Sequence, residues 1–394
     1  ATVKYKKGKK TVKKVLKAKV TVKKKKAAAK ATKKPTTTKA PATTKKPVAT
    51  KAPTVTKTPV PARTPEADPK PANVVADGEV SDSNLTTEHK SRYGAVTKDN
   101  GMMRTNLSAQ DITPAMGMGW NIGNSLEQTG AGSIETMTDA EKAALTDADW
   151  VKGYETNAGN PVSTQKLFSG LKRYGINTIR IPIAWSNMMV QEKQSDGSTY
   201  YRINEAYFDR VEEVINYCLN EEMYVIINDH WDGQWWGMFG DADLSVRAQA
   251  WKKYEDMWTQ IANRYIDYSD RLIFEGANEE LGERLNDNWK GTGGTKGVLT
   301  RKETYALTNE INQKFVDIVR ASGKNNGKRH LLIAGYNTDI DLTCDKLYKM
   351  PADPENRCAV SVHYYTPVTF AILEKDASLS LIHISEPTRQ AEIS

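Results

Sequence analysis

From about residue 116 to residue 365, the sequence alternates apolar, strand-like runs with segments whose apolar residues recur at helical spacing. The strand-like runs are 116–124, 176–185, 223–231, 272–274, 330–336 and 359–365. The helical segments are 163–174, 204–221, the stretch from Trp251 to Tyr265, and 303–322. Alternation of this kind predicts an α/β fold with parallel strands joined by helices. Six successive units favour a closed barrel over an open sheet.

The charge of the chain is divided between two unlike parts. Residues 1–70 contain 23 Lys and Arg residues against two acids, a net charge of +21, whereas the remainder has a net charge of −13. A basic tail therefore precedes an acidic globular body, which is long enough for one eight-stranded barrel of typically ~250 residues. Tyr5 is the one aromatic residue of the tail, so base-stacking side chains are nearly absent and nucleic-acid binding is not expected.

The region before the barrel divides at about residue 30. Residues 1–30 alternate Val with Lys, which is typical of a remnant of an immunoglobulin-like domain and equally of a solvated basic run. Residues 31–99 are rich in Lys, Thr and Pro and are predicted to form a disordered linker, because they cannot bury enough apolar surface to fold. The basic tail could contact an anionic cell wall or act as a solubilising tether. Its composition predicts an extracellular or cell-surface bacterial protein.

Polar side chains of the kinds used in catalysis stand where four of the predicted strands end. They are Arg180, His230, Asn278 with Glu279, and His363 with Tyr365. In an α/β barrel the C-terminal ends of the strands meet at one rim, and catalytic residues lie there. We therefore expect these six side chains to share one site.

These six residues, in this strand order, resemble glycoside hydrolase family 5, the cellulase-type enzymes, over about residues 100–378. The resemblance implies a (β/α)8 TIM barrel that cleaves β-1,4-glucan-type polysaccharides internally by a retaining double displacement. It gives Glu279 the role of acid/base and gives the other five the binding of substrate and of the catalytic carboxylates. Asn278 would hydrogen-bond the sugar 2-hydroxyl, and Arg180 would keep the nucleophile ionised. Mannanases and xylanases of the family share the same six residues, so the substrate stays open.

The sequence departs from the family pattern after the sixth strand. The resemblance places the nucleophilic Glu on strand seven and a Trp on strand eight, which are expected to lie beyond this match, so we expect the nucleophile to be absent from this chain. Residues 379–389 resemble translated sequencing-adapter DNA, and 379–394 are expected to be a non-native tail. The barrel of residues 100–378 would then be incomplete, and we expect residues 1–394 alone to be inactive and prone to aggregation through an open strand edge. In addition, Glu280 replaces the family's Pro, which is expected to loosen the turn after Glu279.

Four tryptophans gather near the same strand ends. They are Trp185, Trp231, Trp235 and Trp236. The last three are predicted to bind substrate, because an indole ring packs against the C–H face of a sugar while its N–H can bond a hydroxyl. Packing inside the barrel is the alternative for Trp185 and Trp231.

Each strand-end residue also has a structural alternative. Arg180 could belong to an ion pair with Glu275, and the two histidines could be hydrogen-bonded core residues. Two histidines and a glutamate could also bind zinc. Metal-dependent barrel hydrolases commonly begin with His-x-His on strand one, which this chain lacks, so no metal and no other cofactor is predicted. A non-catalytic carbohydrate-binding relative is the alternative to an enzyme.

The number of cysteines and the length of the apolar runs bear on two further classes of protein, those held by disulfides and those that span a membrane. Three cysteines cannot form a fully paired disulfide framework. Cys218 is predicted to be a buried thiol, and a bridge between Cys344 and Cys358 stays open. No apolar run reaches the ~18 residues of a membrane span. The family resemblance implies that the partner is a polysaccharide substrate.

Overall fold

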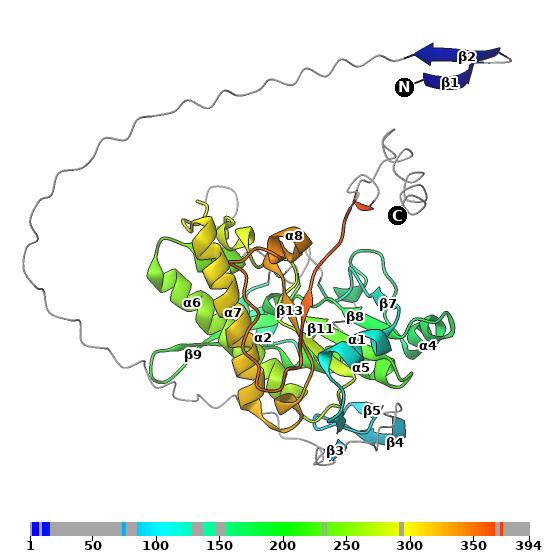
Figure 1. Cartoon of the computed structure of the whole chain (residues 1–394). Coiled ribbons are helices and arrows are strands. Elements are labelled where there is room, and N and C mark those ends of the chain that lie inside the picture. The colour runs from blue at the N-terminus through cyan, green and yellow to red at the C-terminus, as the bar shows by residue number, and fades with distance from the viewer. Residues whose placement is uncertain are drawn as a thin grey trace, which may run out of the picture. The chain divides into compact units, whose positions relative to one another are not determined.

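The structure is a computed structural model. It describes residues 2–7, 10–15, 73–75, 85–127, 137–146, 151, 154–230, 232, 235–290, 295–366 and 371–372. The chain divides into two compact units, Ala1–Thr58 and Pro59–Ser394. In the first unit, β1 (Thr2–Lys7) pairs antiparallel with β2 (Lys10–Val15) (Figure 1). The immunoglobulin-like origin of this hairpin stays a prediction. Most of the predicted linker and all of 379–394 lie outside the described residues.

The second unit is built on six parallel strands whose order in the sheet follows their order in the chain (Figure 1). They are β7 (Gly119–Asn121), β8 (Thr178–Ile181), β11 (Tyr224–Asn228), β12 (Leu272–Glu275), β13 (Leu331–Ala334) and β14 (Cys358–Ser361). Parallel pairing in chain order is the arrangement of a (β/α)8 barrel. The predicted fold class and its series of six strands are confirmed.

Helices and short turns connect the strands. The α-helices are α1 (Ala109–Met116), α2 (Asp139–Ala143), α4 (Gln165–Arg173), α5 (Glu205–Leu219), α6 (Leu244–Arg264), α7 (Arg301–Ser322) and α8 (Ile340–Thr343). The 3₁₀ turns are η2 (Trp185–Met188), η3 (Trp235–Gly240), η4 (Glu283–Asn286), η5 (Lys324–Gly327) and η6 (Tyr336–Thr338). The side chains of Asn204, Asp243 and Thr300 cap α5, α6 and α7 by accepting first-turn N–H groups.

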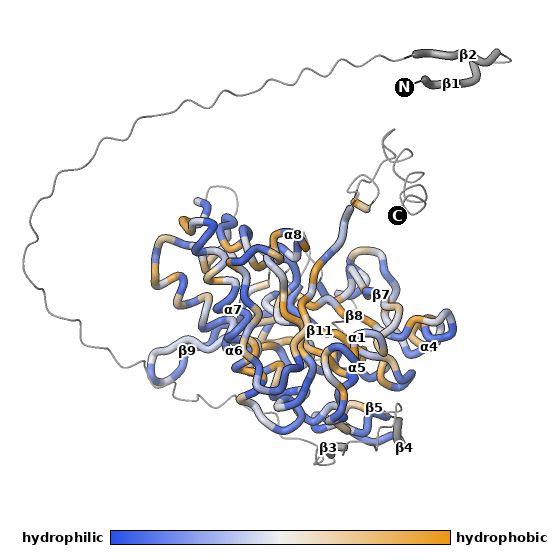
Figure 2. Tube along the Cα trace, viewed as in Figure 1, coloured by the Kyte–Doolittle hydropathy of each residue, from blue (hydrophilic) through white to orange (hydrophobic). Residues whose placement is uncertain are grey.

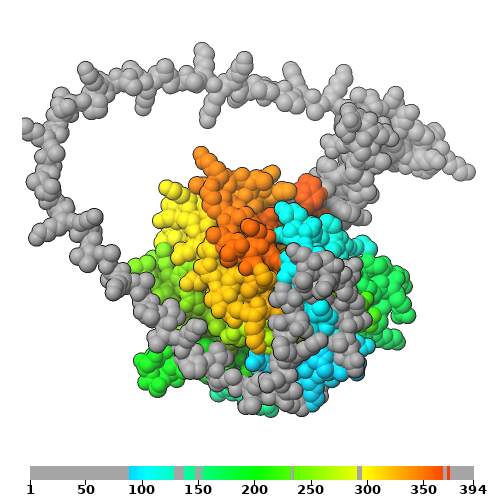
Figure 3. All heavy atoms as spheres, turned by 60° about the horizontal axis from the view of Figure 1, so that its bottom comes forward, coloured from blue at the N-terminus to red at the C-terminus, as the bar shows by residue number. Residues whose placement is uncertain are grey.

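The first and last parts of the barrel unit meet. Helix α1, which precedes the first strand of the sheet, contacts β14. Figure 3 shows residues near 110, in cyan, beside residues near 350, in orange. The start of the barrel unit therefore lies beside the last strand of the sheet.

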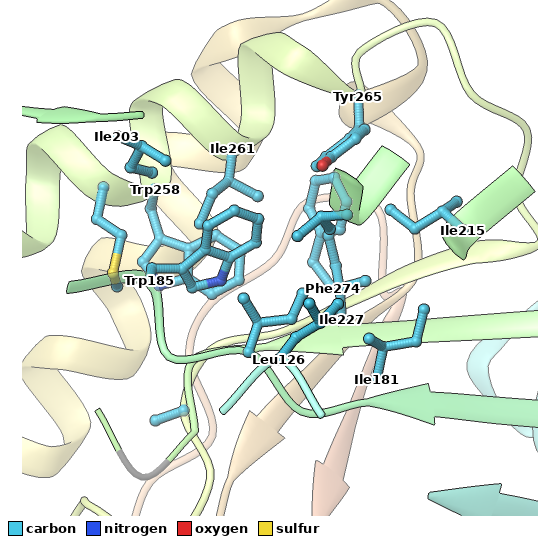
Figure 4. Packing of buried hydrophobic residues seen from close by; sticks show 14 of the residues in the cluster. Leu126, Ile181, Trp185, Ile203, Ile215, Ile227, Trp258, Ile261, Tyr265 and Phe274 are labelled. Carbon is cyan, nitrogen blue, oxygen red and sulfur yellow. The ribbon is translucent and has the colours of Figure 1, made fainter. Parts of the chain in front are cut away.

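The core lies between the sheet and its covering helices. Figure 2 shows β11 as a predominantly hydrophobic strand. Trp185, Trp258 and Ile261 pack close together and are fully buried (Figure 4). The Trp185 indole N–H donates to the Asn228 carbonyl at 2.8 Å, so its polar atom is satisfied inside the core. Packing, the alternative given for Trp185, is therefore its role.

The predicted linker ends too late along the chain. Antiparallel β4 (Leu85–Lys90) and β5 (Val96–Asp99), and parallel β3 (Asn73–Val75) and β6 (Met102–Arg104), precede α1. Ser91 Oγ donates to the buried Glu212 carboxylate at 2.6 Å. The Arg264 guanidinium lies 4.0 Å from the centre of the Tyr93 ring. Residues from 91 onward thus pack against α5 and α6 and belong to the barrel unit, which corrects the boundary placed at residue 100.

A hairpin that the sequence analysis did not predict follows the second barrel strand. It consists of β9 (Met189–Lys193) and β10 (Thr199–Ile203), which pair antiparallel. The β10 backbone bonds α6, because the Ile203 N–H donates to the Gln260 side chain at 2.9 Å. The hairpin is therefore fixed on the outer helix layer.

The three cysteines are free thiols. Cys218 is buried in α5, as predicted, and its Sγ donates to the Val214 carbonyl at 3.3 Å. Cys344 is exposed and Cys358 is half-buried. The bridge that the sequence left open between these two is not formed.

Candidate active site

A cavity of about 700 Å³ opens at the C-terminal ends of the parallel strands. Its wall contains all six strand-end residues singled out from the sequence: Arg180, His230, Asn278, Glu279, His363 and Tyr365. They come from or directly follow β8, β11, β12 and β14. Parallel strands in one sheet end on the same side, and this is why residues so far apart in the chain share one cavity.

Glu279 is held by two side chains that follow β14. His363 Nδ1 lies 2.6 Å from Glu279 Oε1, and the Tyr365 hydroxyl donates to the same oxygen at 2.8 Å. The hydrogen bond from His363 is the main reason why the pKa of Glu279 falls to about 2, although partial burial opposes it. Arg284 Nη2 adds positive charge 3.6 Å from the other oxygen. In this arrangement the carboxylate is ionised and an acceptor, so His363 carries a proton on Nδ1.

Arg180 donates hydrogen bonds to two side chains in the cavity wall. Its Nε donates to Glu275 Oε2 at 2.6 Å, and its Nη2 donates to Asn278 Oδ1 at 2.8 Å. The ion pair with Glu275, which was the structural alternative, is therefore present. It does not exclude a part in binding, because Arg180 also lines the cavity.

His230 is a neutral histidine. Burial, and then the charge of Arg180, lower its pKa to about 3. Two N–H donors approach its Nδ1, namely Arg180 Nη1 at 3.5 Å and Asn228 Nδ2 at 3.3 Å. Since both neighbours are donors, Nδ1 is the acceptor and Nε2 carries the hydrogen. A neutral ring that lines the cavity can thus donate to a hydroxyl oxygen.

Glu280 does not loosen the turn after Glu279, contrary to expectation. Its side chain is buried, and its Oε2 accepts the backbone N–H of Asn278 at 2.7 Å. The far side of the turn is fixed as well, because the Glu283 N–H donates to Asn337 Oδ1 at 2.8 Å. Gly282 has a φ of 107°, and a Cβ there would meet the Asn337 side chain at 2.2 Å. The turn is therefore held from both sides without the family's Pro.

Trp235 and Trp236 do not line the cavity. Both are buried and their rings stack 4.6 Å apart. Their indole N–H groups donate to Asp232 and Asp229 at 3.1 Å, and Trp236 packs edge-on against Tyr254 of α6. This corrects their predicted role as sugar-binding surfaces, because α6 and the aspartates occupy the faces and edges that a sugar would need. Trp231 lies outside the described residues.

The cavity also contains residues that the sequence analysis did not single out. They are Asn121, Asn124, Glu127, Arg284, Ser361 and Tyr364, among others. Asn121 and Ser361 end β7 and β14, so the rule that strand ends face the site could have found them. Glu127 lies in a loop and gives no such signal; burial raises its pKa.

Neither a metal cluster nor a membrane span is found among the described residues. In that part of the chain, no three His, Cys, Asp or Glu side chains group as metal ligands would. No described helix combines the length and apolar character needed to cross a bilayer.

Parallel strands, a strand-end Asn–Glu pair, and an Arg, two His and a Tyr around one rim cavity define the class of barrel glycoside hydrolases. The family model described as "Cellulase (glycosyl hydrolase family 5)" matches residues 139–390. This chain belongs to glycosyl hydrolase family 5.

Individual relatives agree with this placement. The chain is 34% identical to the xyloglucan-specific endo-β-1,4-glucanase of Bacteroides ovatus over 71% of its own length and 49% of that enzyme. It is 32% identical to endoglucanase A of Paenibacillus barcinonensis over 71% of its own length and 63% of that enzyme. It thus spans less than two thirds of either protein.

A solved structure with a bound oligosaccharide has a similar fold. The broad-specificity endoglucanase of Ruminococcus champanellensis, solved with bound cellotriose, superposes with a TM-score of 0.55 at 30% identity. The match covers 69% of this chain and 70% of that one.

Proposed function

We propose that this protein is an endo-acting glycoside hydrolase that cleaves β-1,4-glucan-type polysaccharides by a retaining double displacement. The observation that carries the proposal is the single cavity in which Glu279 lies beside five sugar- and carboxylate-binding side chains. Its volume of about 700 Å³ is in the range of ligand-binding sites. Family membership, and relatives named as endoglucanases, support the reaction and the substrate class.

Glu279 performs the acid/base work in this proposal. It protonates the leaving glycosidic oxygen and then activates the water that releases the glycosyl-enzyme. A pKa of about 2 suits the second step, which needs an ionised base, but not the first. A second carboxylate beside the site raises the pKa of the first, because two like charges disfavour ionisation. The nucleophile therefore has to adjust the pKa of Glu279 as well as attack the sugar.

Two other carboxylates that line the cavity already accept hydrogen bonds on both of their oxygens. Glu275 accepts from Arg180 on one oxygen and from Ser361 on the other. Glu127 accepts the N–H of Asn124 on one oxygen and the N–H of Ser125 on the other. The described residues thus supply the acid/base and the donors, and we assign the nucleophile to neither of these two glutamates.

The test compares hydrolysis by matched variants of the complete reading frame that carries this barrel. Xyloglucan, mixed-linkage glucan, carboxymethylcellulose, mannan and xylan are offered as substrates. Glu279→Gln should lower kcat/KM on the preferred glucan by about 10²–10⁴-fold, the range for loss of one acid/base. Glu283→Gln, an exposed neighbour four residues away, should stay within about twofold. Retention is read from the anomeric form of the first product by proton NMR.

Three outcomes would change the proposal. Preference for mannan or xylan would move the substrate within the family, and an inverted product would remove the double displacement. Oligosaccharide binding with no hydrolysis would favour the non-catalytic carbohydrate-binding relative. Residues 1–394 assayed alone should not exceed their Glu279→Gln variant. If they do, this chain carries its own nucleophile.

We also propose, from composition, that the protein acts outside the cell or at its surface with its basic tail on anionic wall polymers. Residues 1–70 carry a net charge of +21, and such a charge favours binding to polyanions. The chain should be retained on purified cell walls at low salt and released at high salt. A variant with the tail lysines changed to glutamine is the control, and equal retention would remove the tail from this role.

A further inference from the structure

A buried carboxylate, Glu275, links three strands inside the cavity. It ends β12 and is only 1% exposed. Its Oε2 accepts from Arg180 of β8 at 2.6 Å, and its Oε1 accepts from the Ser361 hydroxyl of β14 at 2.6 Å. Strands β8 and β14 are not neighbours in the sheet. The Glu275 side chain therefore connects parts of the rim that no backbone pairing joins.

The chain of hydrogen bonds continues to Asn278. Arg180 Nη2 donates to Asn278 Oδ1 at 2.8 Å. An arginine side chain has donors only, so the amide of Asn278 must turn its oxygen toward Arg180. The Asn278 Nδ2 then points away from the guanidinium. Asn278 itself lines the cavity. The orientation of Asn278 as a donor to ligand thus depends on where Arg180 is held.

We infer that Glu275 and Ser361 are positioning residues of the sugar site. They fix Arg180, and through it they present the Asn278 amide N–H groups to a sugar hydroxyl. The inference deepens the proposed function and rests on it for the identity of the ligand. Neither residue needs to touch the sugar to have this effect.

A purely structural role explains the arrangement less well. A buried ion pair adds little net stability compared with apolar side chains of similar volume. The Glu155–Arg210 pair, which is closed from solvent on both sides, shows what a structural pair in this protein looks like. The Arg180–Glu275 pair instead lies in the cavity wall, where Arg180 keeps 14% of its side chain exposed.

The experiment uses the complete reading frame that carries this barrel, in a Glu279→Gln background so that the sugar is not hydrolysed, and two readouts that do not require turnover. One is the side-chain amide resonances of Asn278 in nitrogen-15 NMR spectra, assigned with an Asn278→Asp variant. The other is cellotetraose affinity by titration calorimetry. Glu275→Gln should shift and broaden the Asn278 resonances and weaken affinity by about tenfold or more, as expected for losing a charge-assisted bond. Ser361→Ala, which removes one donor, should weaken it by about threefold.

Glu155→Gln is the matched control. It breaks a buried Glu–Arg pair of the same kind outside the cavity, so it should lower the melting temperature and leave both readouts unchanged. Ser361→Ala decides the question if Glu275→Gln does not fold. If the Asn278 resonances are unchanged in a folded Glu275→Gln or Ser361→Ala variant, the inference is overturned, even if the stability of that variant has fallen. If the protein without the Glu275 or Ser361 change does not bind cellotetraose, that result counts against the proposed substrate. The Asn278 resonances would still show whether Glu275 and Ser361 position Asn278.

Discussion

The two ends of the same parallel sheet use charged side chains in opposite ways. At the N-terminal end, Arg329 is fully buried, and its guanidinium donates to four backbone carbonyls and to Asn326 Oδ1 at 2.7–3.0 Å. Arg104 there makes a buried ion pair with Asp270 at 2.8 Å. At the C-terminal end, Arg180, Glu279 and His363 face a cavity of about 700 Å³.

The difference separates stability from function. Every donor of the Arg329 guanidinium ends on a protein acceptor, so nothing there is left for a ligand. At the other end, Glu279 keeps 23% of its side chain exposed and His230 keeps an Nε2 donor. Partly satisfied polar groups are tolerated where water or sugar can reach them. We therefore expect mutations at the two ends to affect different measurements.

The largest effect is expected from Arg329→Met. The change removes all five donors, so four buried carbonyls and the side-chain oxygen of Asn326 each lose the hydrogen bond from the guanidinium. The free energy of unfolding should fall by about 3–5 kcal/mol, the range for breaking a buried charged network. Urea unfolding followed by tryptophan fluorescence measures it. Cellotetraose affinity at low temperature, where the variant is still folded, should not change.

Arg284→Met is the matched control at the cavity end. Arg284 has a side chain that is 39% exposed, so its loss should change stability by less than about 0.5 kcal/mol. It should instead weaken sugar binding or raise the pKa of Glu279, since its charge lies 3.6 Å from that carboxylate. If Arg284→Met destabilised the fold as much as Arg329→Met, the division between the two ends would be wrong.

A smaller effect is expected at Glu280, a buried carboxyl side chain that holds the turn beside the cavity. Glu280→Ala leaves the Asn278 N–H without its acceptor, which should lower stability by about 1–3 kcal/mol. The same change should shift the Asn278 backbone amide resonance, because the turn loses its internal bond. Glu283→Ala, on the exposed side of the same segment, should do neither. A Glu280→Ala variant of full stability with an unmoved Asn278 amide would show that the turn is held by its other bonds alone.

Much of the fold follows from local sequence signals. The six strands were predicted because apolar runs such as 224–228 are buried on both faces and end in polar residues. The helices predicted at 204–221 and 303–322 start within two residues of the observed starts of α5 and α7, and both of these helices begin at side-chain caps. The β9–β10 hairpin was missed despite the turn-forming pair Asp196-Gly197, a typical hairpin signal.

Contacts that are distant in sequence account for most of the errors. The boundary at residue 100 was wrong because Ser91 finds its partner 121 residues later. Composition cannot show such a contact. Trp235 and Trp236 were placed in the cavity because they follow a strand, but packing against α6 decides where they lie.

The grouping of the six cavity residues was predictable for a topological reason. Parallel strands end on one side, so polar residues at several strand ends must meet. What the sequence could not show is how they are paired. Arg180 serves both of its candidate roles at once, as ion-pair partner of Glu275 and as donor to Asn278.

The smallest effect is expected at the cavity end of the sheet, from loss of the Tyr365 hydroxyl that bonds Glu279. Tyr365→Phe removes one of two hydrogen bonds to Oε1 and should raise the pKa of Glu279 from about 2 toward its ordinary value of 4.5. His363→Ala should raise it further, because the His363 bond is the larger cause. Carbon-13 NMR of the Glu279 carboxyl group, titrated from pH 2 to pH 7, measures both shifts.

The sign of the accompanying stability change follows from the direction of the pKa shift. A carboxyl group whose pKa is lower in the folded state stabilises the fold above its unfolded pKa of about 4.5, and this contribution disappears as the pH falls toward 2. Tyr365→Phe should therefore reduce stability at pH 6 but make little difference near pH 2. Tyr364→Phe is the control, since Tyr364 is a neighbouring, exposed hydroxyl. Equal shifts in the two variants would mean that general changes in the cavity, rather than the Tyr365 bond, set the pKa of Glu279.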